Sequence, residues 1–66
     1  MLTIIDVEKK IQEIKDAEYD DEKAHVLEDQ LYKAVLEAVV EGDPDAKIMA
    51  EMALTTQDVD FSRWCA

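Results

Sequence analysis

Helix-breaking residues are almost absent from this sequence, which has one glycine and one proline among its 66 residues. They are Gly42 and Pro44, so any break that they impose falls at a single place in the chain. Glycine and proline are the residues least compatible with helix interiors, whereas alanine, which occurs eight times, is the most favourable. The sequence therefore predicts an all-α fold with a break around this glycine and proline.

The first predicted helix covers residues 4 to about 18. Thr3 is a candidate N-cap, and Asp6, three residues later, makes an imperfect capping box with it. The apolar residues that follow are spaced by three and four positions, which places them on one helical face: Ile4, Val7, Ile11 and Ile14.

The apolar pattern stops at an acidic stretch, residues 16–22, in which five of the seven residues are Asp or Glu. Two interpretations are open here. Either the chain turns and Asp20 or Asp21 caps a second helix, or one long helix continues through a solvated stretch. The aspartates favour the turn, because Asp prefers caps and turns to helix interiors.

The second and third predicted helices cover residues 21–41 and 44–55. Gly42 is expected to stop the second helix, Asp43 to cap the third, and Pro44 to occupy the first position of the third. Met52 and Ala53 are expected on the buried face of the third helix, with either Ile48 or Met49. The apolar stripe of the second helix is Ala24, Leu27, Leu31, Ala34 and Ala38, broadened by Val35 and Val39.

These elements predict a single small domain, residues 1–66: an antiparallel helical hairpin, a third helix packed across it, and a short aromatic C-terminal tail. A chain of this size buries only about 60% of its unfolded surface, which gives marginal stability. Its single cysteine excludes an internal disulfide. We therefore expect a homodimer, formed through leftover apolar surface on the flank of the second helix that carries Val26, Leu36 and Val40.

The chain is strongly acidic, with 17 Asp and Glu against 7 Lys and Arg, a formal net charge of −10. This balance counts against direct binding of nucleic acids, which needs clustered Lys and Arg, and against binding to anionic membranes. No apolar run approaches the roughly 20 residues of a membrane span. We expect a cytoplasmic protein that contacts neither nucleic acid nor membrane.

No residue pattern predicts catalysis, a metal site or a cofactor. Glu22 and His25 form a Glu-x-x-His pair, which is half of a di-iron carboxylate pattern, but the apolar stripe of that helix runs along another face. Cys65 has no base near it in sequence, and Ser62 lacks a glycine-rich turn. We expect a protein that is not an enzyme.

Five carboxylates form the first candidate site. In one interpretation they are only a solvated face that confers solubility. In the other they recognise a basic protein, even one that ordinarily binds nucleic acid, because carboxylates on rigid helices can imitate spaced phosphates. The residues are Asp16, Glu18, Asp20, Asp21 and Glu22.

The second candidate site is the aromatic C-terminal tail, with Phe61, Arg63 and Trp64. The two aromatic side chains are too large to be left in water on so small a protein. They are expected either to plug the core or to form an exposed anchor for a partner, with Arg63 beside them.

The run from Ala50 to Ala66, AEMALTTQDVDFSRWCA, ends in Asp-Phe-x-Arg-Trp-x-Ala. It resembles the C-terminus of short accessory proteins encoded by bacteriophages and prophages, over about the last quarter of the chain. The resemblance implies a small protein that acts in the cytoplasm of a bacterial host by binding, and inhibiting or modulating, a host protein. It assigns no catalytic or ligand residue. The alternative expectation is a structural helical oligomer whose charge only confers solubility.

Overall fold

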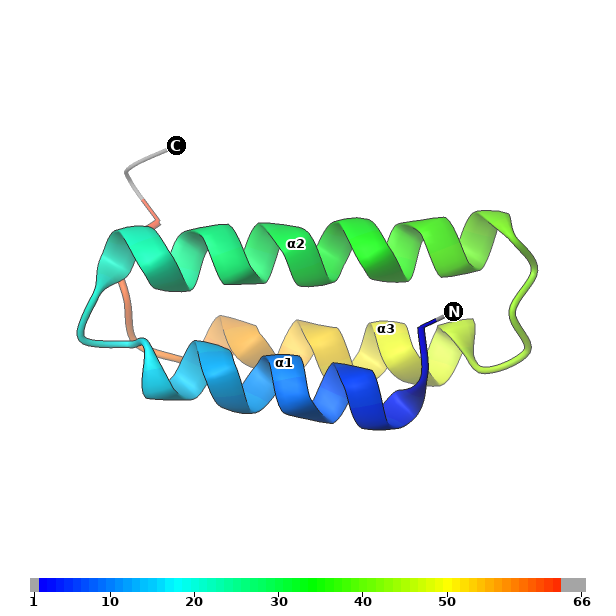
Figure 1. Ribbon diagram of the computed structural model, residues 1–66, viewed down its shortest axis with the longest axis horizontal. Coiled ribbons are helices and arrows are strands. Elements are labelled where there is room, and N and C mark those ends of the chain that lie inside the picture. Colours follow the sequence, from blue (N-terminus) through cyan, green and yellow to red (C-terminus); the bar gives the residue numbers. More distant parts are fainter. Residues whose placement is uncertain (1, 64–66) are drawn as a thin grey trace.

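The computed structural model describes residues 2–63, and within that range it is all-helical without a strand. The longest helix, α2, lies antiparallel to α1 and α3, which pack beside each other along it (Figure 1). The all-α prediction is thereby confirmed. The elements are α1 (Ile4–Asp16), α2 (Asp21–Val40), α3 (Ala46–Leu54) and the 3-10 turn η1 (Thr55–Asp58).

Side chains at the N-termini of the first two helices accept orphan backbone N–H groups. The Thr3 hydroxyl accepts from the Asp6 N–H at 3.1 Å, and the Asp6 carboxylate accepts from the Thr3 N–H at 3.0 Å, a complete capping box. The Asp20 carboxylate accepts from the Lys23 N–H at 3.2 Å and caps α2. The chain therefore turns in the acidic stretch, and α1 ends at Asp16, two residues earlier than expected.

The connection between α2 and α3 starts at Gly42, whose φ of +76° lies in the left-handed region that favours glycine. The Gly42 N–H donates to the Val39 carbonyl at 3.1 Å, and the Asp43 N–H donates to the Ala38 carbonyl at 3.0 Å. This pair of bonds is a Schellman motif, which satisfies the last carbonyls of α2. The predicted stop at Gly42 is confirmed, with α2 ending at Val40.

The predicted start of the third helix was wrong by two residues. The Asp43 carboxylate accepts from the Asp45 N–H at 2.8 Å, and the Asp43 carbonyl accepts from the Ala46 N–H at 3.1 Å. These bonds close a turn in which Pro44 is the second residue, a position that its fixed φ suits. Asp45, not Asp43, is the N-cap residue, and its side chain makes no capping bond.

The core lies where the inward faces of the three helices meet. Met49, rather than Ile48, is the fully buried residue of α3, whereas Ile48 is half exposed. The C-terminal segment adds Val59 and Phe61 to the core, after η1 has turned the chain back toward the start of α2 (Figure 1). The remaining buried apolar residues are Val7, Ile14, Ala17, Ala24, Leu31, Val35, Ala38, Ala46 and Ala53.

Candidate functional site

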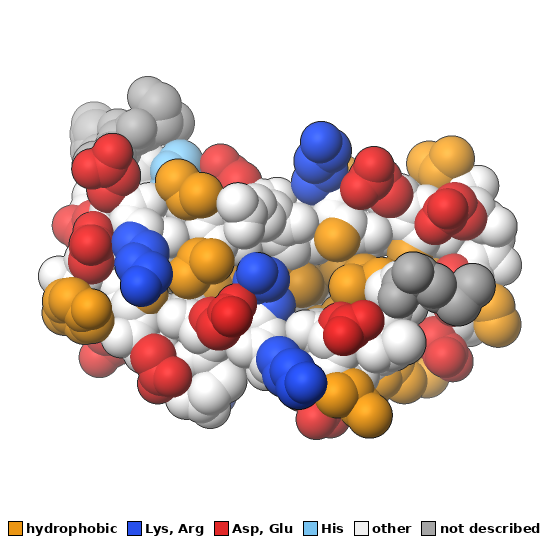
Figure 2. Space-filling view, in the orientation of Figure 1, with side chains coloured by type: hydrophobic (Ala, Val, Ile, Leu, Met, Phe, Trp, Pro, Cys, Tyr) orange, Lys and Arg blue, Asp and Glu red, His pale blue; other side chains and the backbone are white. Residues whose placement is uncertain are grey.

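The structure gathers the five predicted carboxylates around the α1–α2 turn, and all five residues are exposed. Asp16 ends α1, Glu18 and Asp20 lie in the turn, and Asp21 and Glu22 begin α2. On the face shown in Figure 2, Asp and Glu side chains lie at this end of the molecule and also along the rest of the surface. We call these five residues the acidic end.

Three members of the acidic end have defined hydrogen-bond partners. Asp16 accepts from the Gln12 side-chain amide at 2.9 Å, and Asp20 caps α2. Asp21 accepts from the backbone N–H of Ser62 at 3.0 Å, which ties the C-terminal segment to the acidic end. Within residues 2–63, none of the five carboxylates is in an ion pair with Lys, Arg or His. No basic side chain of the described residues is therefore directly paired with them.

An ion pair between a buried carboxylate and a partly exposed arginine lies further along α2. Glu28 is only 3% exposed, whereas every other carboxylate in residues 2–63 is more accessible to solvent. The Arg63 guanidinium donates two parallel hydrogen bonds to the Glu28 carboxylate, from Nε to Oε1 at 2.9 Å and from Nη2 to Oε2 at 3.0 Å. The same guanidinium donates to the carbonyls of Thr56 and Phe61, at 2.9 and 3.2 Å. Arg63 thereby fixes the C-terminal segment against α2.

A chain of hydrogen bonds extends from the ion pair to the surface. The fully buried Thr56 hydroxyl donates to Glu28 Oε2 at 2.7 Å, so it accepts from the Tyr32 hydroxyl at 3.1 Å. The Gln57 side-chain amide in turn donates to the Tyr32 hydroxyl at 2.7 Å. Among the described residues no buried side-chain nitrogen or oxygen lacks a hydrogen-bond partner, so the cluster fits a small core.

Two opposing effects act on the ionisation of Glu28. Burial alone would raise the pKa of this carboxyl, but the hydrogen bonds from Arg63 and Thr56 and the positive charge of Arg63 outweigh it and lower the pKa. The hydrogen bonds to Glu28 have the opposite effect on Arg63 and raise the pKa of its guanidinium. Both groups are thus charged at neutral pH, and each stabilises the charge of the other. This arrangement suits a structural role rather than proton transfer.

Sequence reasoning did not single out Glu28. Its position four residues after Ala24 and three before Leu31 places it on the apolar stripe of α2, where a charged residue is unusual. Arg63 is the only arginine in the sequence, and arginine is the residue best suited to pair with a buried carboxylate. These two facts together were a signal for the pair.

One part of the aromatic tail packs in the core, and the other part lies outside the described residues. Phe61 is 7% exposed and packs in the core, and the Arg63 guanidinium lies 4.0 Å from the centre of its ring. Trp64 lies outside the described residues. The geometry thus places Phe61 in the core and the partly exposed Arg63 against Glu28.

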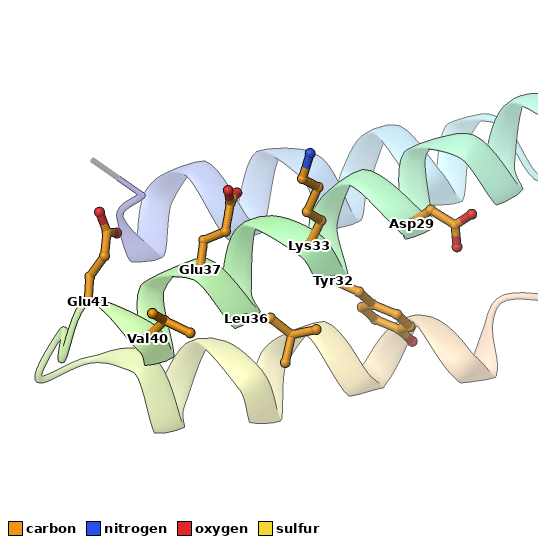
Figure 3. Close-up of a pocket in the computed structure, with 7 residues that line it drawn as sticks. All are labelled: Asp29, Tyr32, Lys33, Leu36, Glu37, Val40 and Glu41. Atoms are coloured by element: carbon orange, nitrogen blue, oxygen red, sulfur yellow. The ribbon is translucent and has the colours of Figure 1, made fainter.

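An apolar groove runs between α2 and α3. It has a volume of about 260 Å³ and is lined by Tyr32, Val35, Leu36, Ala50, Ala53 and Leu54. Tyr32 and Leu36 also line a shallow, more open hollow of about 590 Å³ along the outer face of α2, together with Val40 and four charged residues. In Figure 3, Tyr32 and Leu36 point toward α3, whereas Lys33, Glu37 and Glu41 project away from it.

The Glu22-x-x-His25 pair does not converge with further ligands. The His25 Nε2 atom lies 3.7 Å from the Asp29 carboxylate, one turn further along the same helix. Across residues 2–63, no three His, Cys, Asp or Glu side chains come together in a way that could hold a metal ion. None of the helices in that range is both long enough and apolar enough to cross a membrane.

Comparisons of the chain with protein-family models, with curated proteins and with solved structures found no match.

Proposed function

We propose that this chain is a non-enzymatic interaction protein that binds a basic surface of a partner protein through its acidic end. The observation that carries the proposal is that five exposed carboxylates surround one turn and that none is in an ion pair within residues 2–63. A concentration of fixed negative charge attracts a basic surface over a distance, so it speeds association and makes binding depend on salt.

Hydrogen bonds at the start of α2 support this proposal. Capping by Asp20 and the bond from the Ser62 N–H to Asp21 hold the backbone from which Asp20, Asp21 and Glu22 project. Such carboxylates can occupy the phosphate positions of a basic groove, so the proposed partner includes nucleic-acid-binding proteins. The C-terminal resemblance to bacteriophage accessory proteins suggests a bacterial host protein, inhibited or modulated in the host cytoplasm.

The proposal is tested by neutralising the acidic end without damaging the fold. Asp20 and Asp21 are left unchanged because they accept backbone hydrogen bonds. The variant Asp16→Asn, Glu18→Gln, Glu22→Gln removes three negative charges from the acidic end. Wild-type protein, immobilised and exposed to bacterial lysate, should retain a basic protein at low salt and release it at high salt. The variant should retain much less of it.

A matched variant separates local charge from net charge. Glu8→Gln, Asp45→Asn, Glu51→Gln removes three carboxylates that are exposed and outside the acidic end. It should retain the partner nearly as well as the wild type. Equal losses in both variants, or no salt-sensitive basic protein captured by the wild type, would contradict the proposal.

A second candidate function is a structural homo-oligomer, dimeric in the simplest case, in which charge only confers solubility. The specific observation that favours it is exposed apolar surface along α2 and α3, where Leu36 and Leu54 are each more than 60% exposed. Sedimentation velocity distinguishes the two candidates. A closed assembly that persists at micromolar concentration and captures no partner would favour the oligomer.

A further inference from the structure

We propose that the groove between α2 and α3 binds an amphipathic helix of the partner protein, with an apolar stripe and basic residues on its flanks. This inference rests on the proposed function, since it names the element of the basic partner that is recognised. It adds a second contact surface, separate from the acidic end. The groove is defined by Tyr32, Val35, Leu36, Ala50, Ala53 and Leu54.

The shape of the groove suits a helix. It lies between two antiparallel helices, and the small side chains of Ala50 and Ala53 line it and leave room for a large apolar residue. On α2 the groove spans about one turn, from Tyr32 to Leu36, and the hollow that shares these two residues continues along α2 to Val40. A partner helix with apolar residues at positions i, i+3 or i+4, and i+7 would place one anchor in the groove and the next along this hollow.

Exposed apolar side chains lie in the groove and in the adjoining hollow along α2. Leu36 is 64% exposed, Leu54 is 62% exposed and Val40 is 88% exposed, and the first two face the groove from opposite helices. Figure 3 shows Leu36 extending from α2 toward α3, with Tyr32 one turn away on the same side. Exposed apolar side chains that gather along a groove are typical of a binding surface.

The groove itself is apolar, and the charges on the outer face of α2 next to it favour a basic occupant. The hollow along α2 is bordered by three carboxylates and one ammonium group: Asp29, Glu37, Glu41 and Lys33. A basic flank on the bound helix would meet this negative border. A second copy of the chain would bring the same carboxylates, and a further charge of −10, against it. Charge complementarity therefore favours a basic helix over self-association.

Fluorescence anisotropy with designed peptides tests the groove directly. The first probe is a labelled peptide of about 18 residues, about five helical turns, with leucines on one face and lysines on both flanks. The second probe has the same leucines and glutamates in place of the lysines. The lysine peptide should bind the wild-type protein, and the glutamate peptide should bind at least about tenfold more weakly.

Two groove variants and one matched control locate the binding. Leu36→Ser and Leu54→Ser should each weaken binding of the lysine peptide about tenfold or more. Ile5→Ser should leave it unchanged, because Ile5 is 63% exposed, as accessible as the two leucines, and lies on α1 outside the groove. Circular dichroism on each variant confirms that helix content is retained.

Several outcomes would overturn the inference. They are the absence of peptide binding, equal binding by Leu36→Ser and Ile5→Ser, or a wild-type dimer that Leu36→Ser dissociates in sedimentation velocity. The proposed function fails independently, in the lysate experiment. If neutralising the acidic end abolishes capture of the partner but Leu36→Ser does not, the acidic end is the binding surface and the groove is not.

Discussion

The acidic end and the Glu28–Arg63 pair use the same kind of side chain for opposite purposes. At the acidic end, carboxylates are exposed and are not in ion pairs with basic side chains of the described chain. One and a half turns further along α2, Glu28 is buried, held by two bonds from Arg63 and one from Thr56. Burial and a dedicated partner make a carboxylate part of the fold, whereas exposure without one leaves its charge available to another molecule.

Removing Arg63 is the strongest way to test this contrast. Arg63→Ala should lower the free energy of unfolding by about 3 kcal/mol, because it leaves the buried Glu28 carboxylate without its counter-charge. Urea denaturation followed by circular dichroism measures the change. Lys9→Ala removes an exposed basic residue and should change stability by less than about 0.5 kcal/mol. Comparable effects from both substitutions would mean that the Glu28–Arg63 pair has no special role in stability.

The pH dependence of the pair gives a second, smaller effect. Because the pKa of Glu28 in the folded protein is below the ordinary glutamate value of 4.5, its contribution to stability is fully present above that value. The contribution is lost as the pH falls through the folded-state pKa. Glu28→Gln should therefore be less stable than the wild type by about 2 kcal/mol at pH 7.

The difference between wild type and Glu28→Gln should shrink as the pH falls below about 4.5, since protonation removes the same charge from the wild type. Denaturation curves recorded at neutral pH and at several acidic values measure it. A difference that stays constant down to the most acidic value at which the protein folds would show that ionisation of Glu28 does not stabilise the fold.

The smallest effect on stability is expected at the acidic end. The variant Asp16→Asn, Glu18→Gln, Glu22→Gln should change the free energy of unfolding by less than about 0.5 kcal/mol. Neutralising Asp16 at the end of α1 relieves an unfavourable charge, and neutralising Glu22 at the start of α2 removes a favourable one, so the two largely cancel. Thermal unfolding measures the sum. A loss as large as that of Arg63→Ala would make the acidic end a structural element too.

The sequence predicted most of the fold because local rules decide it. Apolar spacing located the inward faces of α1 and α2, and Thr3 and Gly42 marked a beginning and an end. Val39 was wrongly included in the stripe of α2, because it is 52% exposed. The start of α3 was misplaced because Asp43-Pro44 suits both a helix start and a turn. The structure uses the turn, since both the side chain and the carbonyl of Asp43 accept hydrogen bonds within it.

The acidic end could be found from sequence because its residues are contiguous, but the Glu28–Arg63 pair could not be found in the same way. In an apolar pattern, a carboxylate on the stripe counts only as an interruption. The partner that makes its burial possible, Arg63, is 35 residues away in the sequence. The α2–α3 groove also depends on tertiary packing, because Leu36 and Leu54 become neighbours of one hollow only when the two helices pack.

The Glu28–Arg63 pair also makes the stability of the fold depend on how far synthesis of the chain has proceeded. During translation, α1, α2 and α3 emerge from the ribosome before the residue that completes the interior does. A nascent or truncated chain that stops short of Arg63 has every helix but leaves an acidic group without its counter-ion in the middle of the bundle. A chain must extend through residue 63 to form this pair, so shorter copies should be less stable and more open to proteolysis.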